Sequence, residues 1–421
     1  MNLDMKNKLA SLKAELNRRG ADGGAICDAL LDYYSIFDES IVTWLGSLYD
    51  PEIGGFYYSN SARDNELIHL EEGSYKLLPD VESTEQALRL LKTSGIISDY
   101  RELPEGMQEK IKEFVCSLED EETGFFYHPQ WTREMVDKNP SRRGRDIRWA
   151  IAIAKGLGFD FPYPTALERL SKIDTSKNEK PKLPEYLYDK EKFLEYLRSF
   201  DWNEGAYVAG NAISAQSGMI EASGLMDTAI GFLDEVQNSA TGLWGTIGGH
   251  TAINAYLKLS NFYTTYNRAL KNTDKAIETA LECIVSDETV NTVCWQYNVW
   301  CAAKNILNNT KRFGTESEAS LILKRLYDIA PEAIRSTKRK ALTFKKPDGS
   351  FSFKPKCTSY VSQGLPVALK ETNEGDINST LLCTSATTEN LYLALDLKDF
   401  EIPVFSRDFY PAFLAAAKQK M

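Results

Sequence analysis

The chain has 421 residues, of which 43% are hydrophobic and 26% are charged, and its formal net charge is −11 at pH 7. This composition is typical of a soluble globular protein, and the length allows two average domains or one large domain built from repeats. The acidic balance argues against non-specific nucleic-acid binding and against binding to anionic membranes, because both require a basic surface.

The seven cysteines are scattered along the chain, and no two of them form a CxxC pair. An odd number of scattered cysteines in a chain this long is typical of reduced thiols, so we expect a cytoplasmic protein. The amphipathic stretch from Met1 to Arg19 lacks the apolar core of a signal peptide, and no run of about 18 apolar residues predicts a membrane span. We therefore expect neither a membrane nor a nucleic-acid partner, and the oligomeric state stays open.

Apolar residues at helical spacing predict a series of helices in the first half of the chain, and most of these end at glycines. The predicted helices cover about 3–19, 25–49, 80–91, 105–119 and 146–157. Short aromatic stretches, Gly55–Ser59 and Ile68–Leu70, carry the strand signals. A polar loop that contains Arg142, Arg143 and Gly144 is predicted before the helix that starts at residue 146.

The second half of the chain continues the same alternation after a Lys-, Pro- and Ser-rich segment, 165–185, which predicts a surface excursion. The predicted helices cover about 188–199, 209–223, 225–237, 249–267, 272–286, 291–308, 317–338, 377–396 and 405–419. A long loop over 343–376 contains Gly349, Pro355, Gly364 and Pro366. We expect this loop to act as a plug or as a lid over a substrate.

An internal repeat connects the helices. Its fullest copy is Gln237-Asn-Ser-Ala-Thr-Gly-Leu-Trp244, where an acidic amphipathic stretch closes on a turn of glycine and aromatic residues. Further copies are Leu45–Tyr57 and Val115–Tyr127, and weaker ones are Asp201–Tyr207 and Pro347–Phe351. Each repeat unit needs neighbours to bury its apolar face, so the repeat indicates the architecture more than the chemistry.

Six helical hairpins result, with turns near residues 54, 124, 205, 242, 288 and 349. Six helix pairs in sequence predict an all-α fold that closes as an (α/α)6 toroid with short β excursions in its loops, and an open solenoid is the alternative. We expect a single toroid domain over 1–421. It would comprise an N-terminal helix and turn (1–24), the toroid itself (25–400) and a C-terminal helix (401–421).

The turn in Gln237–Trp244 resembles the turn motif of the α/α-toroid superfamily of terpenoid cyclases and protein prenyltransferases. Related barrels occur among polysaccharide lyases and glycoside hydrolases. The resemblance covers roughly residues 25–400 and implies how an outer helix leads into an inner one. Its motif is structural and says little about the reaction.

In such a ring the inner helices start at one mouth of a central cavity, where exposed N–H groups favour anionic ligands. Asp80 and Glu82, with Asp146 on the neighbouring hairpin, predict a carboxylate pair for glycoside hydrolysis, while helix capping is the alternative. We expect Arg145 to bind a substrate carboxylate through two hydrogen bonds or to pair with loop acids. Asn211 is expected to bind substrate at another inner helix start.

His250 follows Gly248-Gly249 at a helix start, and Asn254 lies on the same helix face. We expect His250 to act as a general base or acid and Asn254 to orient the substrate, with a capping histidine as the alternative. Trp295 and Tyr297 are two residues apart, so a helix points them in different directions. Trp295 is expected to bind substrate, and Tyr297 is a candidate acid in a lyase, although helical aromatics more often belong to the core.

Several motifs are missing. The chain has no Asp-x-Asp-Asp run for protonating a polyprene, no Asp-x-Cys plus His set for a prenyltransferase zinc ion, no P-loop and no Gly-x-Ser-x-Gly elbow. Its three histidines are scattered, which disfavours a histidine-rich metal site. We therefore expect no metal and no cofactor, and isoprenoid chemistry is disfavoured.

These patterns favour a carbohydrate-processing enzyme that hydrolyses or eliminates an oligosaccharide in a central cavity. In a hydrolase, Asp146 and Asp80 would serve as acid and base. In a lyase, His250 or Tyr297 would take the proton next to a uronate carboxylate that Arg145 neutralises. The alternatives are an isoprenoid-type enzyme for an apolar ligand and a binding or scaffold toroid without catalysis.

Overall fold

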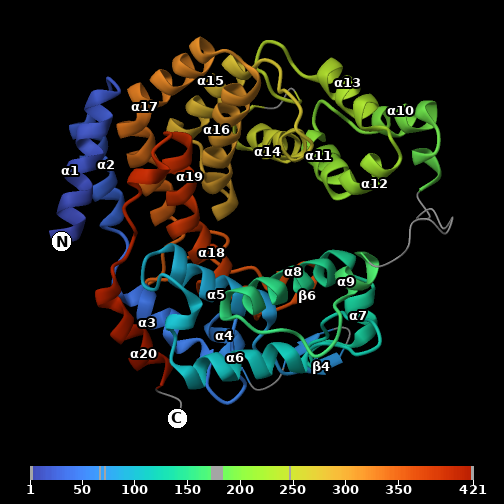
Figure 1. The fold of residues 1–421 in the computed structure, drawn as a ribbon, viewed down its shortest axis with the longest axis vertical. Helices are drawn as coiled ribbons and strands as arrows, with labels where there is room; N and C mark the ends of the chain where they lie inside the picture. The colour runs from blue at the N-terminus through green and yellow to red at the C-terminus, as the bar shows by residue number, and fades with distance from the viewer. Residues whose placement is uncertain (1–2, 66–67, 71–72, 172–183, 246–247, 419–421) are drawn as a thin grey trace. The chain divides into compact units, whose positions relative to one another are not determined.

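The computed structural model describes residues 3–65, 68–70, 73–171, 184–245 and 248–418 (Figure 1). The protein is mostly helical, with short antiparallel two-stranded sheets in its loops, as the sequence predicts. Among these residues, no helix is long and apolar enough to cross a bilayer. The chain forms two compact units: the first comprises 1–34, 178–341 and 387–402, and the second comprises 35–177, 342–386 and 403–421. The single toroid over 25–400 stays a prediction.

The first unit is built from helices. They are α1 (Leu3–Arg18), α2 (Gly23–Tyr34), α10 (Lys190–Arg198), α11 (Ala206–Ala215), α12 (Ser217–Ala222), α13 (Met226–Val236), α14 (Gly249–Thr265), α15 (Thr273–Val285), α16 (Val293–Phe313), α17 (Glu316–Leu342) and α19 (Thr387–Ala394). Helix α14 packs between α11 and α16, and α16 also packs against α15 and α19 (Figure 1). Trp244, Trp300 and Tyr256 are fully buried in this unit.

The second unit adds small sheets to its helices. The helices are α3 (Glu39–Ser47), α4 (Asn60–Asp64), α5 (Val81–Thr93), α6 (Glu105–Ser117), α7 (Arg133–Asp137), α8 (Pro140–Leu157), α9 (Ala166–Ser171), α18 (Ile377–Leu381) and α20 (Tyr410–Ala417). The paired strands are β1 (Tyr49–Asp50) with β2 (Gly55–Phe56), β3 (Ile68–Leu70) with β4 (Gly73–Tyr75), and β5 (Val361–Ser362) with β6 (Leu365–Pro366). Helix α5 packs between α8 and α18, and α3 packs against α20.

The predicted repeat forms one recurring turn. In the copies that start at Asp50, Asp120, Asp201 and Asn238, the glycine four residues later donates its N–H to the carbonyl of the starting residue, at 2.7 to 2.9 Å. The side-chain oxygen of the starting residue accepts N–H groups inside the turn. These bonds satisfy the backbone locally, as expected for Asp and Asn at such positions.

Glycine is required at the end of most of these turns. Gly54, Gly124 and Gly242 have φ values of +88°, +69° and +70°, a region that other residues rarely adopt. A Cβ atom at any of them would also lie 2.1 to 2.5 Å from a backbone atom of another segment. The turn therefore packs its glycine directly against a neighbouring backbone.

Two of the predicted helix boundaries are wrong. The helix predicted over 25–49 is two helices, α2 and α3, because the extended residue Asp38 caps α3 and accepts the N–H of Ser40. The polar loop predicted through Arg142–Gly144 is helical instead, since α8 starts at Pro140, a residue suited to a first turn. Arg142 and Asp146 therefore share one face of α8, four residues apart.

The remaining differences are local. The helix predicted over 209–223 is divided into α11 and α12, and the one over 377–396 contains a π-helical stretch, Leu382–Ala386, between α18 and α19. The C-terminal helix begins as a 3-10 turn, Arg407–Phe409. A surface excursion is predicted over 165–185. Helix α9 covers its start, and residues 172–183 lie outside the described residues.

The long segment 343–376 is a loop, as predicted, and it carries the β5–β6 hairpin. Gln363 and Gly364 at the hairpin tip both have positive φ, +52° and +83°, which suits a two-residue hairpin turn. Trp131 donates its indole N–H to the carbonyl of Pro366 at 2.9 Å. This bond ties the hairpin to the loop that precedes α7.

Candidate functional site

Three carboxylates of the second unit converge on one buried arginine. Arg142 donates to Asp80 and Glu82 at 2.9 Å each, and its Nε lies 2.9 to 3.0 Å from the carboxylate oxygens of Asp146. All four side chains are between 0 and 3% exposed. The guanidinium also lies over the ring of Trp131, 4.4 Å from its centroid. Two adjacent helices, α5 and α8, thus supply one compact charged cluster, which we call the carboxylate cluster.

Asp80 has a structural role inside this cluster. It is the N-cap of α5, where its side chain accepts the N–H and the hydroxyl of Ser83 at 3.0 and 2.7 Å. The capping alternative for this acidic residue therefore describes its contacts, and the same carboxylate also binds Arg142. Glu82 and Asp146 have no capping role and are the better candidates for proton transfer.

Burial shapes the charge state of the carboxylate cluster. Burial raises the pKa of Asp146 to about 7, against the opposing effect of Arg142. It also raises the pKa of Glu82, and Arg142 and Ser362 oppose that shift. One guanidinium faces three carboxyl groups, so the cluster holds a proton up to about neutral pH.

His128 completes the carboxylate cluster on its inner side. Its Nε2 accepts the backbone N–H of Val81 at 3.1 Å, so in the neutral ring the proton sits on Nδ1. Nδ1 lies 3.7 Å from a carboxylate oxygen of Asp146. Burial lowers the pKa of His128 to about 3, which keeps the ring neutral. His128 therefore lies next to Asp146 as a neutral ring, without a hydrogen bond to it.

The β5–β6 hairpin covers the Glu82 side of the carboxylate cluster. The hydroxyl of Ser362 donates to Glu82 at 2.5 Å, and Gln86 links Glu82 to Asn378 through bonds of 3.2 and 3.3 Å. Ser362 and Asn378 are only partly buried. Glu82 thus has Arg142 on one side and partly buried side chains on the other, and both of its carboxylate oxygens accept hydrogen bonds.

The structure separates the predicted site residues into two groups. Asp80, Glu82 and Asp146 come together in the second unit, and exposed Arg145 lies on the same helix, α8, over the ring of Trp149 at 5.9 Å. The other predicted residues belong to the first unit: His250, Asn254, Trp295, Tyr297 and Asn211. Asn211 is exposed on α11.

Three of the first-unit residues, His250, Asn254 and Trp295, lie at or near the start of α14. The ring of His250 lies 5.3 Å from that of Trp295, and its Nδ1 is 3.2 Å from Sγ of Cys283. Asn254 accepts a hydrogen bond from Asn298 at 2.8 Å. Tyr297 contacts the buried thiol of Cys301. Burial and, to a lesser degree, Lys340 lower the pKa of His250 to about 4.

Sequence reasoning missed the residues that complete both groups. Arg142 was assigned to a loop, although its spacing from Asp146 is the signal that an earlier helix start would have revealed. His128 follows the repeat turn of Val115–Tyr127 directly, a position that could have marked it. Cys283 and Glu288 carry no motif that points to His250.

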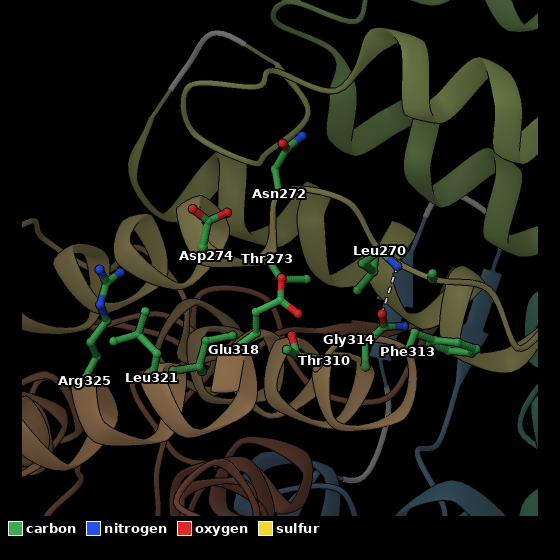
Figure 2. A pocket seen from close by; sticks show the side chains of 13 residues that line it. Leu270, Asn272, Thr273, Asp274, Thr310, Phe313, Gly314, Glu318, Leu321 and Arg325 are labelled. Atoms are coloured by element: carbon green, nitrogen blue, oxygen red, sulfur yellow. Dashed lines mark hydrogen bonds between the residues drawn. The ribbon is translucent and has the colours of Figure 1, made fainter. Parts of the chain in front are cut away.

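A surface pocket in the first unit holds none of the predicted residues. It has a volume of about 210 Å³ and lies between the start of α15 and the facing ends of α16 and α17 (Figure 2). Leu270 on its wall donates its N–H to Asn309 at 2.8 Å. Glu318 accepts the N–H of Thr315 at the start of α17, a capping contact. These polar groups of the pocket therefore form hydrogen bonds at the ends of helices.

Comparison with protein-family models, with curated proteins and with solved structures finds no match. Functional conclusions therefore rest on the geometry of the two groups.

Proposed function

We propose that the chain is an (α/α)6 toroid that processes an oligosaccharide, with the carboxylate cluster as its acid–base centre. The recurring glycine turn supports the toroid, because it has the same hydrogen bonds in four copies spread over both units. The rows α8–α5–α18 and α11–α14–α16–α19, each made of neighbouring helices, are what consecutive inner helices of such a ring would form.

The observation that carries the catalytic proposal is the convergence of three buried carboxyl groups on one guanidinium. Glycoside hydrolysis needs one carboxyl that is protonated near neutral pH and a second one that is ionised. Asp146, whose pKa is raised to about 7, supplies the protonated carboxyl. Three carboxyl groups share one guanidinium, so full ionisation would leave the cluster with excess negative charge, and this excess keeps Asp146 protonated.

In this proposal Glu82 exchanges the proton with the substrate. The pKa of Glu82 is set by its burial and by the charges of Arg142, Asp80 and Asp146. Glu82 protonates the glycosidic oxygen as the C–O bond breaks, a water molecule attacks the anomeric carbon, and the proton that this water releases returns to the cluster. Hydrolysis is favoured over elimination because the candidate bases for elimination are engaged elsewhere. His250 faces Cys283, and Tyr297 faces Cys301.

The test is a thermal-shift and turnover screen with neutral and uronate oligosaccharides, with a prenyl diphosphate as the contrasting ligand. A ligand that binds only the folded state at about 100 times its Kd stabilises that state by about 2.7 kcal/mol. We expect one sugar class to raise Tm and to be cleaved. Glu82→Gln and Asp146→Asn should abolish turnover, and exposed Glu109→Gln should keep it.

The alternatives give different results in the same screen. Stabilisation by the prenyl diphosphate alone would favour the isoprenoid-type enzyme. No stabilisation by any ligand, or full turnover by Glu82→Gln, would contradict the proposed function and favour a scaffold.

A further inference from the structure

We infer that the first unit contains a zinc site formed by His250, Cys283 and Glu288. A ring nitrogen, the thiol and a carboxylate oxygen of these residues all lie within 4.8 Å of one another. His250 lies at the start of α14, Cys283 in the last turn of α15, and Glu288 in the loop between α15 and α16. One nitrogen, one sulfur and one oxygen form a donor set that proteins use for Zn²⁺.

Two of the three ligands are held rigidly inside the unit. His250 is 0% and Cys283 is 3% exposed, and their Nδ1 and Sγ atoms are 3.2 Å apart. The ring nitrogen of His250 that faces Cys283 is Nδ1, so Nδ1 is the atom that would bind the metal ion. Its separation from Sγ is close to the distance between two ligands of one tetrahedral zinc ion, whose bonds are about 2.0 to 2.3 Å long.

The backbone is shaped to admit the third ligand. Gly249 has a φ of +67°, and a Cβ atom at this position would lie 2.5 Å from a carboxylate oxygen of Glu288. That carboxylate accepts the backbone N–H of His250 at 3.3 Å. A residue with a side chain at position 249 would therefore push Glu288 away from the other two ligands.

The same residues do not form a nucleophilic triad. In such a triad the acid bonds the ring nitrogen that faces away from the nucleophile. Here Glu288 contacts the backbone of His250, and the thiol is buried away from substrate. The convergence of these three side chains therefore fits metal binding and does not fit nucleophilic catalysis.

Lys340 lies near the site without filling it. Its ammonium donates to the carbonyl oxygens of Cys283 and Ile284 at 3.0 and 2.8 Å. These bonds occupy the last carbonyls of α15 and fix the helix end that carries Cys283.

A bound zinc ion would need only a small adjustment of the loop. Zinc–ligand bonds are about 2.0 to 2.3 Å long, so Glu288, which is exposed, must move toward the other two ligands. The thiol proton would be released to solvent on binding. Three protein ligands leave a fourth position for water or a substrate atom, as in catalytic zinc sites, and Trp295 lies beside His250. The sequence-based expectation of no metal does not consider this set, because its members are far apart in the chain.

The experiment uses the full chain, treated with a chelator and then titrated with Co²⁺ and Zn²⁺. We expect one equivalent of Co²⁺ to give tetrahedral d–d bands and a thiolate-to-cobalt charge-transfer band, both lost when Zn²⁺ is added. Cys283→Ser should lose the charge-transfer band, and Cys301→Ser, which changes another buried thiol of the same unit, should keep it. Glu288→Gln should weaken zinc binding, measured against a chromophoric chelator, by about tenfold or more.

Two results would overturn the inference. One is a wild-type spectrum without a charge-transfer band. The other is a zinc affinity that Glu288→Gln leaves unchanged; because Glu288 is exposed, this variant keeps the test valid even if Cys283→Ser does not fold. A failed sugar screen would leave both results untouched, since the zinc readouts need no substrate.

Discussion

The carboxylate cluster of the second unit and the His250 group of the first unit balance negative charge in different ways. Around Arg142, three carboxyl groups surround a fixed guanidinium, and burial leaves one of them protonated near pH 7. Around His250, a thiol, an imidazole and a carboxylate converge beside the ammonium of Lys340, which donates its hydrogen bonds to backbone carbonyl oxygens. The first group takes its missing positive charge as a proton, and we propose that the second takes it as a metal ion.

This difference shows that similar burial can serve different chemistry. Both groups lie at the start of a helix, in α8 and α14, and each contains a buried histidine with a lowered pKa. What separates them is where the cation donates its hydrogen bonds. Arg142 donates to the three carboxyl groups themselves, whereas Lys340 donates to backbone carbonyl oxygens and leaves the donor atoms of the His250 group available for coordination.

The largest effect is expected from removing the guanidinium of Arg142. Arg142→Met leaves buried carboxylates without their partner, so the free energy of unfolding should fall by about 3–5 kcal/mol. Exposed Arg148→Met on the same helix should change it by less than about 0.5 kcal/mol. Urea unfolding followed by circular dichroism measures both. A loss below about 1 kcal/mol for Arg142→Met would show that the cluster does not depend on the arginine.

The pH dependence of stability should reveal the proton. The pKa of Asp146 rises from an ordinary value of 3.8 to about 7, so between these values the folded state binds a proton that the unfolded state lacks. This contribution is complete below pH 4 and is lost as the pH rises through 7, with a slope of up to about 1.4 kcal/mol per pH unit.

Asp146→Asn removes this contribution, so the stability of the wild type relative to the variant should decline from pH 4 to pH 7. Unfolding curves at a series of pH values give this difference directly. The exposed carboxylate variant Asp160→Asn should run parallel to the wild type. A constant difference between wild type and Asp146→Asn would contradict the raised pKa.

The repeat turns should respond alike in both units. Gly124→Ala in the second unit and Gly242→Ala in the first force a side chain into left-handed backbone and against a neighbouring segment, so each should cost about 2 kcal/mol or more. Gly224 has a φ of +75° with open space around it, so Gly224→Ala should cost only about 1 kcal/mol. Thermal unfolding orders the three variants. Equal losses in all of them would mean that the close packing of the turns has no energetic weight.

The smallest effect is expected at the hairpin that covers the carboxylate cluster. Ser362→Ala removes the hydroxyl that opposes the raised pKa of Glu82, so stability should fall by about 1 kcal/mol and that pKa should rise further. Ser141→Ala removes an exposed contact to the tip of the same hairpin and should have almost no effect. Unfolding at pH 8 compares the two variants. Identical stabilities would show that the hydrogen bond from Ser362 to Glu82 does not stabilise the protein.

The sequence predicted helices and turns better than it predicted the candidate sites. Helical spacing and the glycine turns lead to most of the elements, because both signals are local. The start of α8 was misplaced because a run of arginines is typical of an exposed loop, whereas Arg142 is held inside by acidic residues from another helix. Asp80, Glu82 and Asp146 were grouped together from the sequence, as they are in the structure. Arg142, the cation that they share, was not assigned to this group.

The His250 group could not be predicted for a related reason. Cys283 and Glu288 come from the end of one helix and the loop after it, and nothing local connects them to a histidine 33 residues before the cysteine. Only the packing of α14 against α15 brings the three together.

The most direct test of the central claim is infrared difference spectroscopy of the buried carboxyl groups across a pH titration. We predict that the wild type has a protonated carboxyl C=O band that disappears with a midpoint near pH 7 and that is absent in Asp146→Asn. A wild type with no carboxyl band titrating above pH 5, or with one that Asp146→Asn leaves in place, would contradict the proton assigned to the cluster and the acid–base function built on it.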